Sequence, residues 1–563
     1  MKVIIVGGVA GGATAAARIR RLDEHAEITV FERSGYISYA NCGLPYYIGD
    51  VITDPEELTL QTPESFFKRF RINMKIHHEV ISIHPERKTV SVKNLENGEI
   101  FEENYDKLIL SPGAKPTQPR LPGVGMDKLF TLRTVEDTFR IKEYINKNHP
   151  KSAVLAGGGF IGLELAENLR ELGMDVTIVQ GPKQLMNPFD PDMASMIHNE
   201  MRKHGIKLVL GYTVEGFKEK DNGVEVLLKD NPSLQADMVV LAIGVTPDTA
   251  LAKEAGLELG IKGSIVVNDR METSVPDIYA AGDAVQVKHY VTGDDALISL
   301  AGPANKQGRI IADNICGGDS RYLGSQGSSV IKVFDMTAAT TGINETNAKK
   351  SGLEVDTVIL SPMSHAGYYP GGKVMTMKVV FEKETYRLLG AQIIGYEGVD
   401  KRIDVLATAI HAGLNATQLK DLDLAYAPPY SSAKDPVNMA GFMIDNIAKG
   451  TLKQWHLEDM DKISKDKDVE LLDVRTVGEF SRGHIDGFKN IPVDELRERI
   501  SEIEKGKPVY LICQSGLRSY IASRILEGNG YETYNFSGGF RFYDAVVNDR
   551  ALIERAYACG MDY

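Results

Sequence analysis

A strand, a glycine-rich turn and a helix at the start of the chain restrict its fold more than any other feature. Residues 2–6 are an unbroken apolar run, Gly7 to Gly12 form the turn, and an alanine-rich helix is predicted to continue to about Leu22. Apolar runs without polar alternation are typical of parallel strands that are covered on both faces. The N-terminus of a helix in this setting binds the pyrophosphate of a dinucleotide. The chain is therefore predicted to have an α/β fold.

The next predicted strand, residues 27–32, supports a dinucleotide site. It ends in Glu32, twenty residues after Gly12, which is the spacing at which an acidic side chain meets a ribose hydroxyl. Val9 stands where the fingerprint expects its second glycine, so the match is incomplete. Glycine-rich turns also occur without ligands, yet strand, turn, helix and terminal acid together favour a bound dinucleotide.

A second, complete fingerprint begins at residue 152. Gly157, Gly159 and Gly162 have the required spacing, and another predicted strand follows at 175–180. We therefore expect a second dinucleotide. This strand ends in Gln180 rather than in an acid, so both NADH and NADPH remain open.

Length, charge and cysteine content restrict the function classes. A chain of 563 residues is predicted to hold three or four domains. Its net charge of −13 argues against nucleic acid and anionic membranes as partners. No run reaches the roughly 20 apolar residues of a membrane span. The four cysteines are too few and too scattered for a disulfide framework or a metal site, so we expect no metal, a reducing compartment and a cytoplasmic protein.

Cys42 lies in the loop between Tyr36 and Tyr47 and is the leading candidate for a reactive thiol. Gly43 permits close backbone approach and Pro45 suits the first turn of a helix, a setting that stabilises a thiolate. No second cysteine lies nearby, so a partner sulfur would have to come from another molecule. The alternative is a small buried hydrophobic residue without chemistry.

Basic residues gather near the first fingerprint. They are Arg18, Arg20 and Arg21 on or just beyond its helix, and Lys68, Arg69 and Arg71 further along. Such residues usually form a solvated surface, but arginine forks also bind phosphate in a bidentate manner. The cluster is compatible with a phosphate-rich ligand.

Two similar segments, residues 106–116 and 237–247, enclose the second fingerprint. Each is a predicted strand that ends in a turn of small residues. A further strand ends in Gly282 and Asp283, where the aspartate alone would be only a helix cap. Two fingerprints and this turn resemble the two-dinucleotide flavoprotein reductases over residues 1–450. The resemblance implies FAD in the first site, with Asp283 accepting from a ribityl hydroxyl, and a nicotinamide nucleotide in the second.

The same resemblance implies the domain organisation. It comprises two nested Rossmann-like domains, an FAD-binding domain (1–112 and 247–325) and an NAD(P)-binding domain (113–246), then an α+β dimerisation domain (326–452), and hence a homodimer. The residues implied to bind the two cofactors are Gly7, Ala10, Gly11, Gly12, Glu32, Arg33, Ser111, Gly113, Gly157, Gly159, Ile161, Gly162, Glu164, Gln180, Gly244, Gly282, Asp283 and Tyr426.

A tyrosine-rich segment, residues 424–436, lies where dithiol disulfide reductases would have a histidine base. Together with residues 38–42 and 365–369 it resembles the coenzyme A disulfide reductases. The resemblance implies that Tyr426 and Tyr368, with Tyr369 as the alternative to Tyr368, reach the redox sulfur of the partner subunit. The residues implied to contact coenzyme A are Thr14, Arg18, Arg21, Ser38, Asn41, Asn305 and Lys434.

A different pattern begins after the charged segment 453–468, which we expect to be a linker. A predicted strand at 508–513 ends in Cys513 and runs directly into Gln-Ser-Gly-Leu and Arg518. Successive backbone N–H groups at a helix N-terminus stabilise a thiolate or persulfide, whereas a core cysteine at a strand end would be inert. Residues 469–563 resemble the α/β rhodanese domain, in which Arg518 would close the cradle around a catalytic Cys513. Asp473, Arg475 and His484 are expected to brace this loop.

The whole chain thus resembles a coenzyme A disulfide reductase fused to rhodanese. This implies an FAD- and NAD(P)H-dependent reductase of coenzyme A disulfide, coenzyme A persulfide or polysulfide, in which electrons reach a mixed disulfide of Cys42. The pKa of Cys42 is expected to lie below the ~8.5 of free cysteine, because flavin, a helix start and a tyrosine hydroxyl favour the thiolate. Two alternatives remain open. One is an NADH oxidase or peroxidase with Cys42 as sulfenic acid, and the other is a non-enzymatic persulfide carrier or redox sensor.

Overall fold

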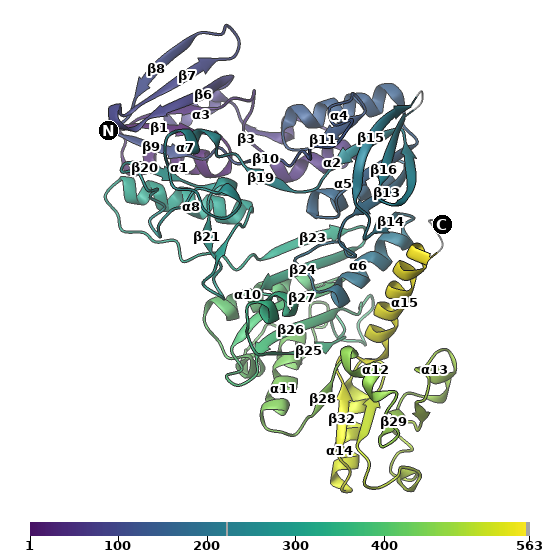
Figure 1. The fold of residues 1–563 in the computed structure, drawn as a ribbon. Coiled ribbons are helices and arrows are strands. Elements are labelled where there is room, and N and C mark those ends of the chain that lie inside the picture. Colours follow the sequence, from purple (N-terminus) through teal and green to yellow (C-terminus); the bar gives the residue numbers. More distant parts are fainter. Residues whose placement is uncertain (221–222, 559–563) are drawn as a thin grey trace. The chain divides into compact units, whose positions relative to one another are not determined.

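The computed structural model describes residues 1–220 and 223–558, which form two compact units (Figure 1). The first unit comprises Met1–Pro182 and Gly205–Gly327, and the second comprises Lys183–His204 and Ser328–Tyr563. Within these two ranges, no helix is both long enough and apolar enough to cross a bilayer.

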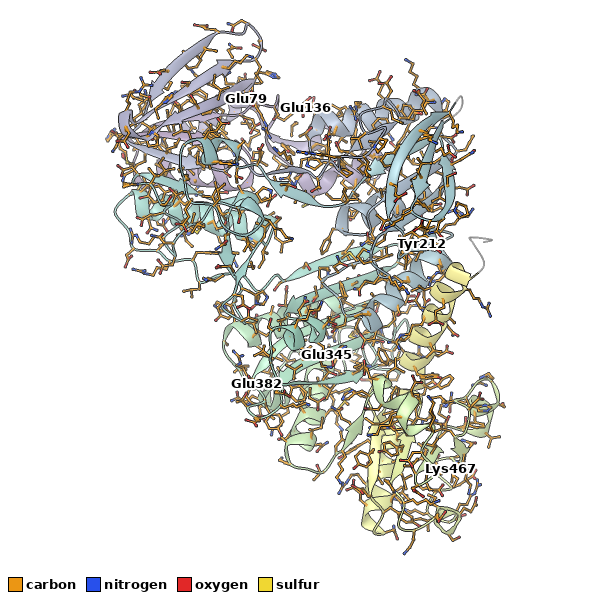
Figure 2. The ribbon with its side chains drawn as sticks, in the orientation of Figure 1. Glu79, Glu136, Tyr212, Glu345, Glu382 and Lys467 are labelled. Atoms are coloured by element: carbon orange, nitrogen blue, oxygen red, sulfur yellow. The ribbon has the colours of Figure 1, made fainter. Side chains whose placement is uncertain are left out.

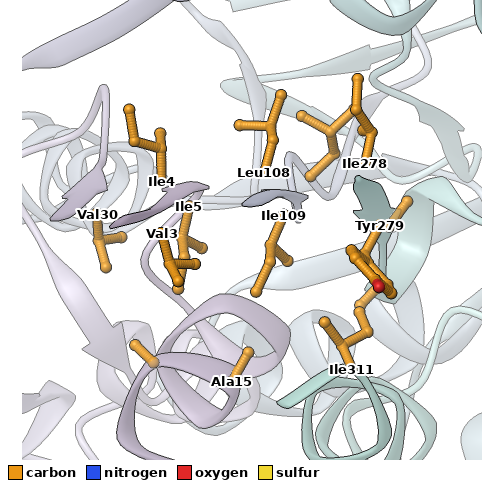
Figure 3. Close-up of a cluster of buried hydrophobic side chains, with 14 of the residues drawn as sticks. Val3, Ile4, Ile5, Ala15, Val30, Leu108, Ile109, Ile278, Tyr279 and Ile311 are labelled. Atoms are coloured by element: carbon orange, nitrogen blue, oxygen red, sulfur yellow. The ribbon is translucent and has the colours of Figure 1, made fainter. Parts of the chain in front are cut away.

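The first unit contains a parallel sheet with the order β20-β9-β1-β2-β5. Val3, Ile4 and Ile5 are fully buried, and Figure 3 shows Ile4 pointing away from the other two. Both faces of the sheet are therefore covered, which accounts for the unbroken apolar run. The elements are β1 (Lys2–Val6), β2 (Glu27–Phe31), β5 (Asn73–Lys75), β9 (Lys107–Leu110) and β20 (Ile278–Ala280), with helices α1 (Ala10–Leu22) and α8 (Ala301–Ile315).

A second parallel sheet in this unit has the order β11-β18-β12-β13-β14 and includes the second fingerprint. The two similar segments of the sequence meet, because β10 (Ala114–Pro116) and β19 (Val245–Pro247) form an antiparallel pair. The elements are β11 (Leu129–Thr131), β12 (Ser152–Ala156), β13 (Asp175–Gln180), β14 (Lys207–Leu210), β18 (Met238–Leu241), α4 (Val135–Asn148) and α5 (Phe160–Glu171). The unit also contains antiparallel sheets β6-β7-β8 (His78–His84, Thr89–Asn94, Ile100–Asn104) and β15-β16-β17 (Val214–Lys220, Gly223–Leu228, Asn231–Ala236).

The second unit contains an antiparallel sheet with the order β23-β24-β27-β26-β25. The helix expected near 399–412 is α10, Val399–His411. The other elements are β23 (Ser329–Val333), β24 (Met336–Gly342), β25 (Val355–Leu360), β26 (Thr376–Glu382), β27 (Leu388–Gly395), α9 (Glu345–Lys350) and α11 (Pro436–Ala448).

A buried ion cluster brings α6 (Pro191–Lys203) into this unit, although the sequence analysis assigned residues 113–246 to one nucleotide-binding domain. Lys378 on β26 is 1% exposed, and its Nζ lies 2.7 Å from Asp192, 2.8 Å from Glu345 and 3.2 Å from Asp190. Figure 2 labels Glu345 within the packed side chains of this unit. The carboxylates hold the pKa of Lys378 above its usual value although burial acts against the charge. Segment 183–204 therefore packs with the antiparallel sheet.

The C-terminal sheet is parallel, with the order β28-β32-β31-β29-β30. Its first strand lies inside segment 453–468, so the expected linker is wrong in part. Trp455 is 2% exposed and packs against Phe536 with 4.5 Å between ring centroids, which draws the charged segment into the domain. The elements are β28 (Gln454–Trp455), β29 (Glu470–Asp473), β30 (Lys489–Asn490), β31 (Val509–Ile512), β32 (Thr533–Phe536), α12 (Met460–Ile463), α13 (Val477–Ser481), α14 (Leu517–Gly528) and α15 (Gly539–Ala558).

Buried polar contacts join this C-terminal sheet domain to the rest of the second unit. Asp549 on α15 accepts from Arg202 at 2.5 Å and pairs with His198 at 2.8 Å, both on α6. His456 pairs with Asp356 on β25 at 3.0 Å, and Ser537 Oγ accepts from the N–H of Ile359 at 3.0 Å. These contacts, and not only the connecting segment, hold the C-terminal domain against the rest of the second unit.

Replacing Lys378 by methionine tests the ion cluster. We expect Lys378→Met to lower the free energy of unfolding by about 3–5 kcal/mol, because removing one partner leaves buried carboxylates without compensation. The control is Lys349→Met, since Lys349 pairs with the same Glu345 but is 58% exposed, and a loss of under about 0.5 kcal/mol is expected. Denaturant unfolding measures both changes, and equal losses in the two variants would contradict the account.

Candidate active site

Contacts that leave no room for a Cβ atom fix the first nucleotide turn. Gly7 has φ of +96°, and a Cβ there would lie 2.1 Å from the carbonyl oxygen of Ser111. A Cβ on Gly12 would lie 1.9 Å from the oxygen of Gly7, so only glycine allows α1 to approach β1 this closely. No side chain caps the N-terminus of this helix of 13 residues. Its first N–H groups fit the phosphates of a dinucleotide.

Glu32 lies at the end of β2, as the fingerprint requires, and is 8% exposed. Its carboxylate accepts from the N–H of Gly8 at 2.8 Å and from the N–H of Ser34 at 2.9 Å. The acid is thus held against the turn that would bind the dinucleotide. Arg33 beside it forms an ion pair with Asp248 at 2.8 Å.

The second turn repeats this geometry. Gly157 has φ of +122°, and a Cβ on Gly162 would lie 2.1 Å from the oxygen of Gly157. Gln180 accepts from the N–H of Gly158 at 2.9 Å, which matches the bond between Gly8 and Glu32. Apart from its chain neighbours, no described residue comes within 4 Å of a Cβ placed on Gly159, and no described side chain caps α5. The turn is open on the side where a pyrophosphate would lie, so it fits a second dinucleotide.

The remaining cofactor candidates in the first unit lie on connecting turns. Gly282 donates its N–H to Gln307 at 2.7 Å, and Asp283 is paired with Arg133 at 2.8 Å. Sequence reasoning missed Arg133 and Gln307, because neither lies in a fingerprint. The other candidates in this unit are Ala10, Gly11 and Ile161 in the first turns of α1 and α5, Ser111 after β9, and Gly113 and Gly244 with φ of +71° and +103°.

Cys42 lies in a short 3₁₀ turn, Asn41–Gly43, immediately before α2 (Leu44–Ile48), and is exposed. The expected low pKa is contradicted by the protein groups around it. Desolvation raises the pKa of the Cys42 thiol, and the Glu164 carboxylate raises it further, while Arg133 acts in the opposite direction. The helix start is too short to offset these effects, since α2 has five residues.

Glu164 on α5 is partly buried, and its charge acts on Cys42. Burial, and then the charge of Glu167, raise the pKa of Glu164 to about 7. Burial and the same two glutamates raise the pKa of Tyr46 to about 12. The second fingerprint helix therefore carries a titratable group whose charge opposes ionisation of Cys42.

The residues implied to contact coenzyme A differ in their pairing and exposure. Thr14 on α1 donates to Asn305 on α8 at 2.5 Å, and Arg18 pairs with Asp313 at 2.8 Å. Arg21 and Lys434 are exposed. Ser38 has φ of +44° and Asn41 is partly buried, both close to Cys42 in the chain.

Arg20 is a structural residue, unlike its neighbours in the basic cluster. It is 7% exposed and donates to five backbone carbonyl oxygens. They belong to Asp23, Glu24, Ala26, Phe70 and Arg71. This arginine closes the end of α1 and is not available to a phosphate.

The two predicted tyrosines meet in the second unit. The hydroxyl groups of Tyr368 and Tyr426 are 2.7 Å apart, and both side chains are exposed. The hydrogen bond to Tyr368 raises the pKa of Tyr426. Tyr369, the alternative, instead packs its ring edge-on against His365 at 5.6 Å.

Arg402 on α10 holds the two tyrosine segments together. It is 1% exposed and donates to the carbonyl oxygens of Ser364 at 2.9 Å and Tyr430 at 3.3 Å, and its charge is paired with Asp435 at 3.0 Å. The sequence contains no signal for this role, because the three partners lie 28 to 38 residues away.

Cys513 lies at the end of β31 and is 1% exposed. Its Sγ accepts from the N–H of Gly516 at 3.1 Å and from the Ser519 hydroxyl at 3.2 Å, which supports the predicted sulfur cradle. Arg518 makes two hydrogen bonds of 2.7 Å to Glu479, a partner that sequence reasoning missed.

The bracing residues lie close to this loop. Arg475 pairs with Asp473 at 2.7 Å, donates to Gly483 at 2.8 Å and lies 3.8 Å from the ring centre of Phe540. The backbone N–H of Phe540 in turn donates to the carbonyl of Cys513 at 2.7 Å. His484 stacks on Phe480.

The two remaining cysteines lie outside the motifs that define these sites. Cys316 follows α8 and is partly exposed, and Cys559 lies outside the described residues. Across the described part of the chain, no three His, Cys, Asp or Glu side chains are arranged to hold a metal ion.

Glu164→Gln tests the electrostatic account of Cys42. The variant should lower the pKa of the Cys42 thiol, because it removes a negative charge that opposes thiolate formation. The rate of iodoacetamide alkylation against pH measures the change. Glu136→Gln removes an exposed glutamate that does not affect Cys42, and it should leave the profile as in the wild type. An unchanged profile in Glu164→Gln would exclude this glutamate as a cause.

Comparison with known proteins agrees with this geometry. Residues 1–308 match the model of the pyridine nucleotide-disulphide oxidoreductase family, 328–436 match its dimerisation domain, and 456–545 match the rhodanese-like domain. A coenzyme A disulfide reductase of Staphylococcus aureus (strain JH9) is 39% identical over 443 residues, 78% of this chain and 99% of that protein.

Two solved structures are similar over nearly the whole chain. Reduced Bacillus anthracis CoADR-RHD is 49% identical with a TM-score of 0.95, and 98% of each chain is covered. A NAD-dependent persulfide reductase from A. fulgidus is 38% identical with a TM-score of 0.90, covering 96% of this chain and 100% of that one. The chain therefore belongs to the pyridine nucleotide-disulphide oxidoreductase family and is an FAD- and NAD(P)H-dependent oxidoreductase acting on sulfur, with a rhodanese-like domain at its C-terminal end.

Proposed function

We propose that the protein is a cytoplasmic homodimer that reduces coenzyme A disulfide, coenzyme A persulfide or polysulfide through Cys42. One observation carries this proposal. Cys42 is exposed in its loop, and the next cysteine in the chain is Cys316. A resolving thiol within the loop is lacking, so the second sulfur of the disulfide comes from the substrate.

The flavin, when bound, accepts a hydride from the nicotinamide nucleotide and supplies an electron pair to a disulfide. The chain's own residues have three tasks. Cys42 forms the mixed disulfide, the basic and polar groups at Thr14, Arg18, Arg21 and Lys434 bind phosphate-rich substrate, and the tyrosine pair handles a proton. The hydrogen bond between the two hydroxyls keeps the proton on Tyr426 at neutral pH, so the pair holds a proton that can pass to a leaving thiolate.

We propose that the C-terminal domain feeds this reaction. Cys513 takes sulfane sulfur as a persulfide, and coenzyme A then carries it to Cys42. An oxidase with Cys42 as sulfenic acid would use neither phosphate ligands nor a second sulfur site, and it is therefore the less favoured candidate.

Two cysteine variants test the division of labour. Cys42→Ser should lower NADH-dependent reduction of coenzyme A disulfide by more than about a thousandfold, because losing a covalent nucleophile removes the step. The same variant should still transfer sulfur at Cys513. Cys513→Ser should instead lose sulfur transfer and keep the reduction of coenzyme A disulfide. Loss of both activities in both variants would reveal a shared folding defect. NADH-dependent oxygen consumption that requires Cys42 and no disulfide substrate would favour the oxidase.

The tyrosine pair gives a separate prediction. Tyr426→Phe and Tyr368→Phe should each lower kcat for disulfide reduction by about 10²-fold, and the double variant should lower it no further, because the hydroxyls act as one unit. Steady-state kinetics measures this. Tyr430→Phe is the control, since Tyr430 lies in the same segment and is 72% exposed. Multiplicative losses in the double variant would show that the hydroxyls act independently.

A further inference from the structure

The arginines beside the Cys513 loop are compensated by carboxylates. Arg518 makes its bidentate pair with Glu479, and Arg475 is paired with Asp473. Hydrogen bonds and the charge of Arg518 lower the pKa of Glu479 to about 2, so the carboxylate stays ionised throughout the pH range of an enzyme assay. The guanidinium next to the sulfur therefore adds no net positive charge for a ligand.

The groups that touch the sulfur itself are uncharged. Gly516 donates its N–H, and Ser519 its hydroxyl, to Cys513 Sγ. Such dipoles stabilise one negative charge on sulfur. They do not offset the additional charges of a dianionic donor that approaches a thiolate.

Exposed aliphatic side chains lie close in sequence to these groups. Leu517 begins α14 beside Arg518 and is 66% exposed, and Val477 lies two residues before Glu479 and is 62% exposed. Ile521, one turn after Leu517, is 43% exposed. Exposed aliphatic side chains at a reaction site suit a donor with an uncharged, partly apolar arm.

Arg541 is an exposed arginine beside the loop, and Arg482 is another at the end of α13. Arg541 contacts the loop through its backbone N–H, which donates to Gln514 at 3.2 Å, and its side chain is exposed. It is separate from the pair between Arg518 and Glu479, so its contribution is testable on its own.

We propose that Glu479 determines the sulfur donor of the C-terminal domain. By compensating Arg518 it selects a persulfide on an uncharged thiol arm and disfavours small dianions such as thiosulfate. The proposal deepens the function proposed above and rests on it only for the later use of the persulfide.

The transfer balances without an oxidant or a reductant. The Cys513 thiolate attacks the outer sulfur of R–S–SH, the S–S bond of the donor breaks, and R–S⁻ leaves while Cys513 becomes a persulfide. An acceptor such as cyanide then removes the outer sulfur as thiocyanate and restores the thiolate.

The test uses the full chain with cyanide as acceptor and no pyridine nucleotide. Thiosulfate and pantetheine persulfide are compared as donors by thiocyanate formation. The wild type should prefer pantetheine persulfide, and Glu479→Gln should shift the ratio of kcat/KM values toward thiosulfate by at least tenfold, because it frees the charge of Arg518. Glu502→Gln is the matched control, since it removes an exposed partner of Arg499 in the same domain, and the ratio should stay as in the wild type.

The Glu479 side chain also takes part in the N-terminal cap of α13, so Glu479→Gln could disturb the structure around Cys513. A second variant controls for this effect. Leu517→Arg adds a cation at an exposed position and should shift the ratio in the same direction. A wild type that uses thiosulfate at least as well as pantetheine persulfide would overturn the proposal. So would thiosulfate turnover that disappears in Arg541→Met, because Arg541 would then be the anion receptor. Failure of coenzyme A disulfide reduction by the wild type counts only against the function proposed above, since this assay does not use Cys42.

Discussion

Close approach of a helix to the end of its strand, permitted only by glycine, is the contact on which both nucleotide sites depend. In each turn a Cβ on the last glycine would lie about 2 Å from the carbonyl oxygen of the first, between Gly12 and Gly7 and between Gly162 and Gly157. Because of this contact, the backbone N–H groups at the start of the helix, which no described side chain caps, all point toward the place where a phosphate would bind. The contact also brings the end of the next strand to the turn, where Glu32 or Gln180 accepts from a backbone N–H. The sites are built by backbone geometry rather than by side chains.

Features that depend on residues close together in the chain were predictable from sequence, because spacing and composition determine the local backbone geometry. The apolar runs became buried parallel strands, and residues 106–116 and 237–247, noticed only as similar segments, meet as β10 and β19. Tyr368 and Tyr426 are a different case, because a family resemblance and not local spacing singled them out. Their hydroxyls are 2.7 Å apart although the residues are 58 positions apart in the chain, and their action on a redox sulfur stays a prediction. Spacing and composition suffice wherever a turn or a strand end carries the function.

Partners that are distant in sequence were not predictable. Arg402, Arg133 and Glu479 lie outside any motif, yet each pairs with a candidate residue or holds its segment. Lys378 ties segment 183–204 to the antiparallel sheet through Asp190 and Asp192, a contact that sequence position does not show. The sequence shows the helix start after Cys42, but it does not show that burial and Glu164 raise the pKa of this thiol. Long-range ion pairs and desolvation depend on the folded chain, and one sequence does not reveal them.

Among the cysteines that the structure describes, Cys42 alone is exposed, and it has no second cysteine in its loop. One half of a disulfide must therefore be supplied from outside. The most direct test is the mass of the protein after incubation with coenzyme A disulfide, followed by peptide mapping. The account predicts one coenzyme A per chain on the peptide that contains Cys42, removed on addition of NADH. An adduct on Cys316, or added oxygen without coenzyme A on Cys42, would contradict it.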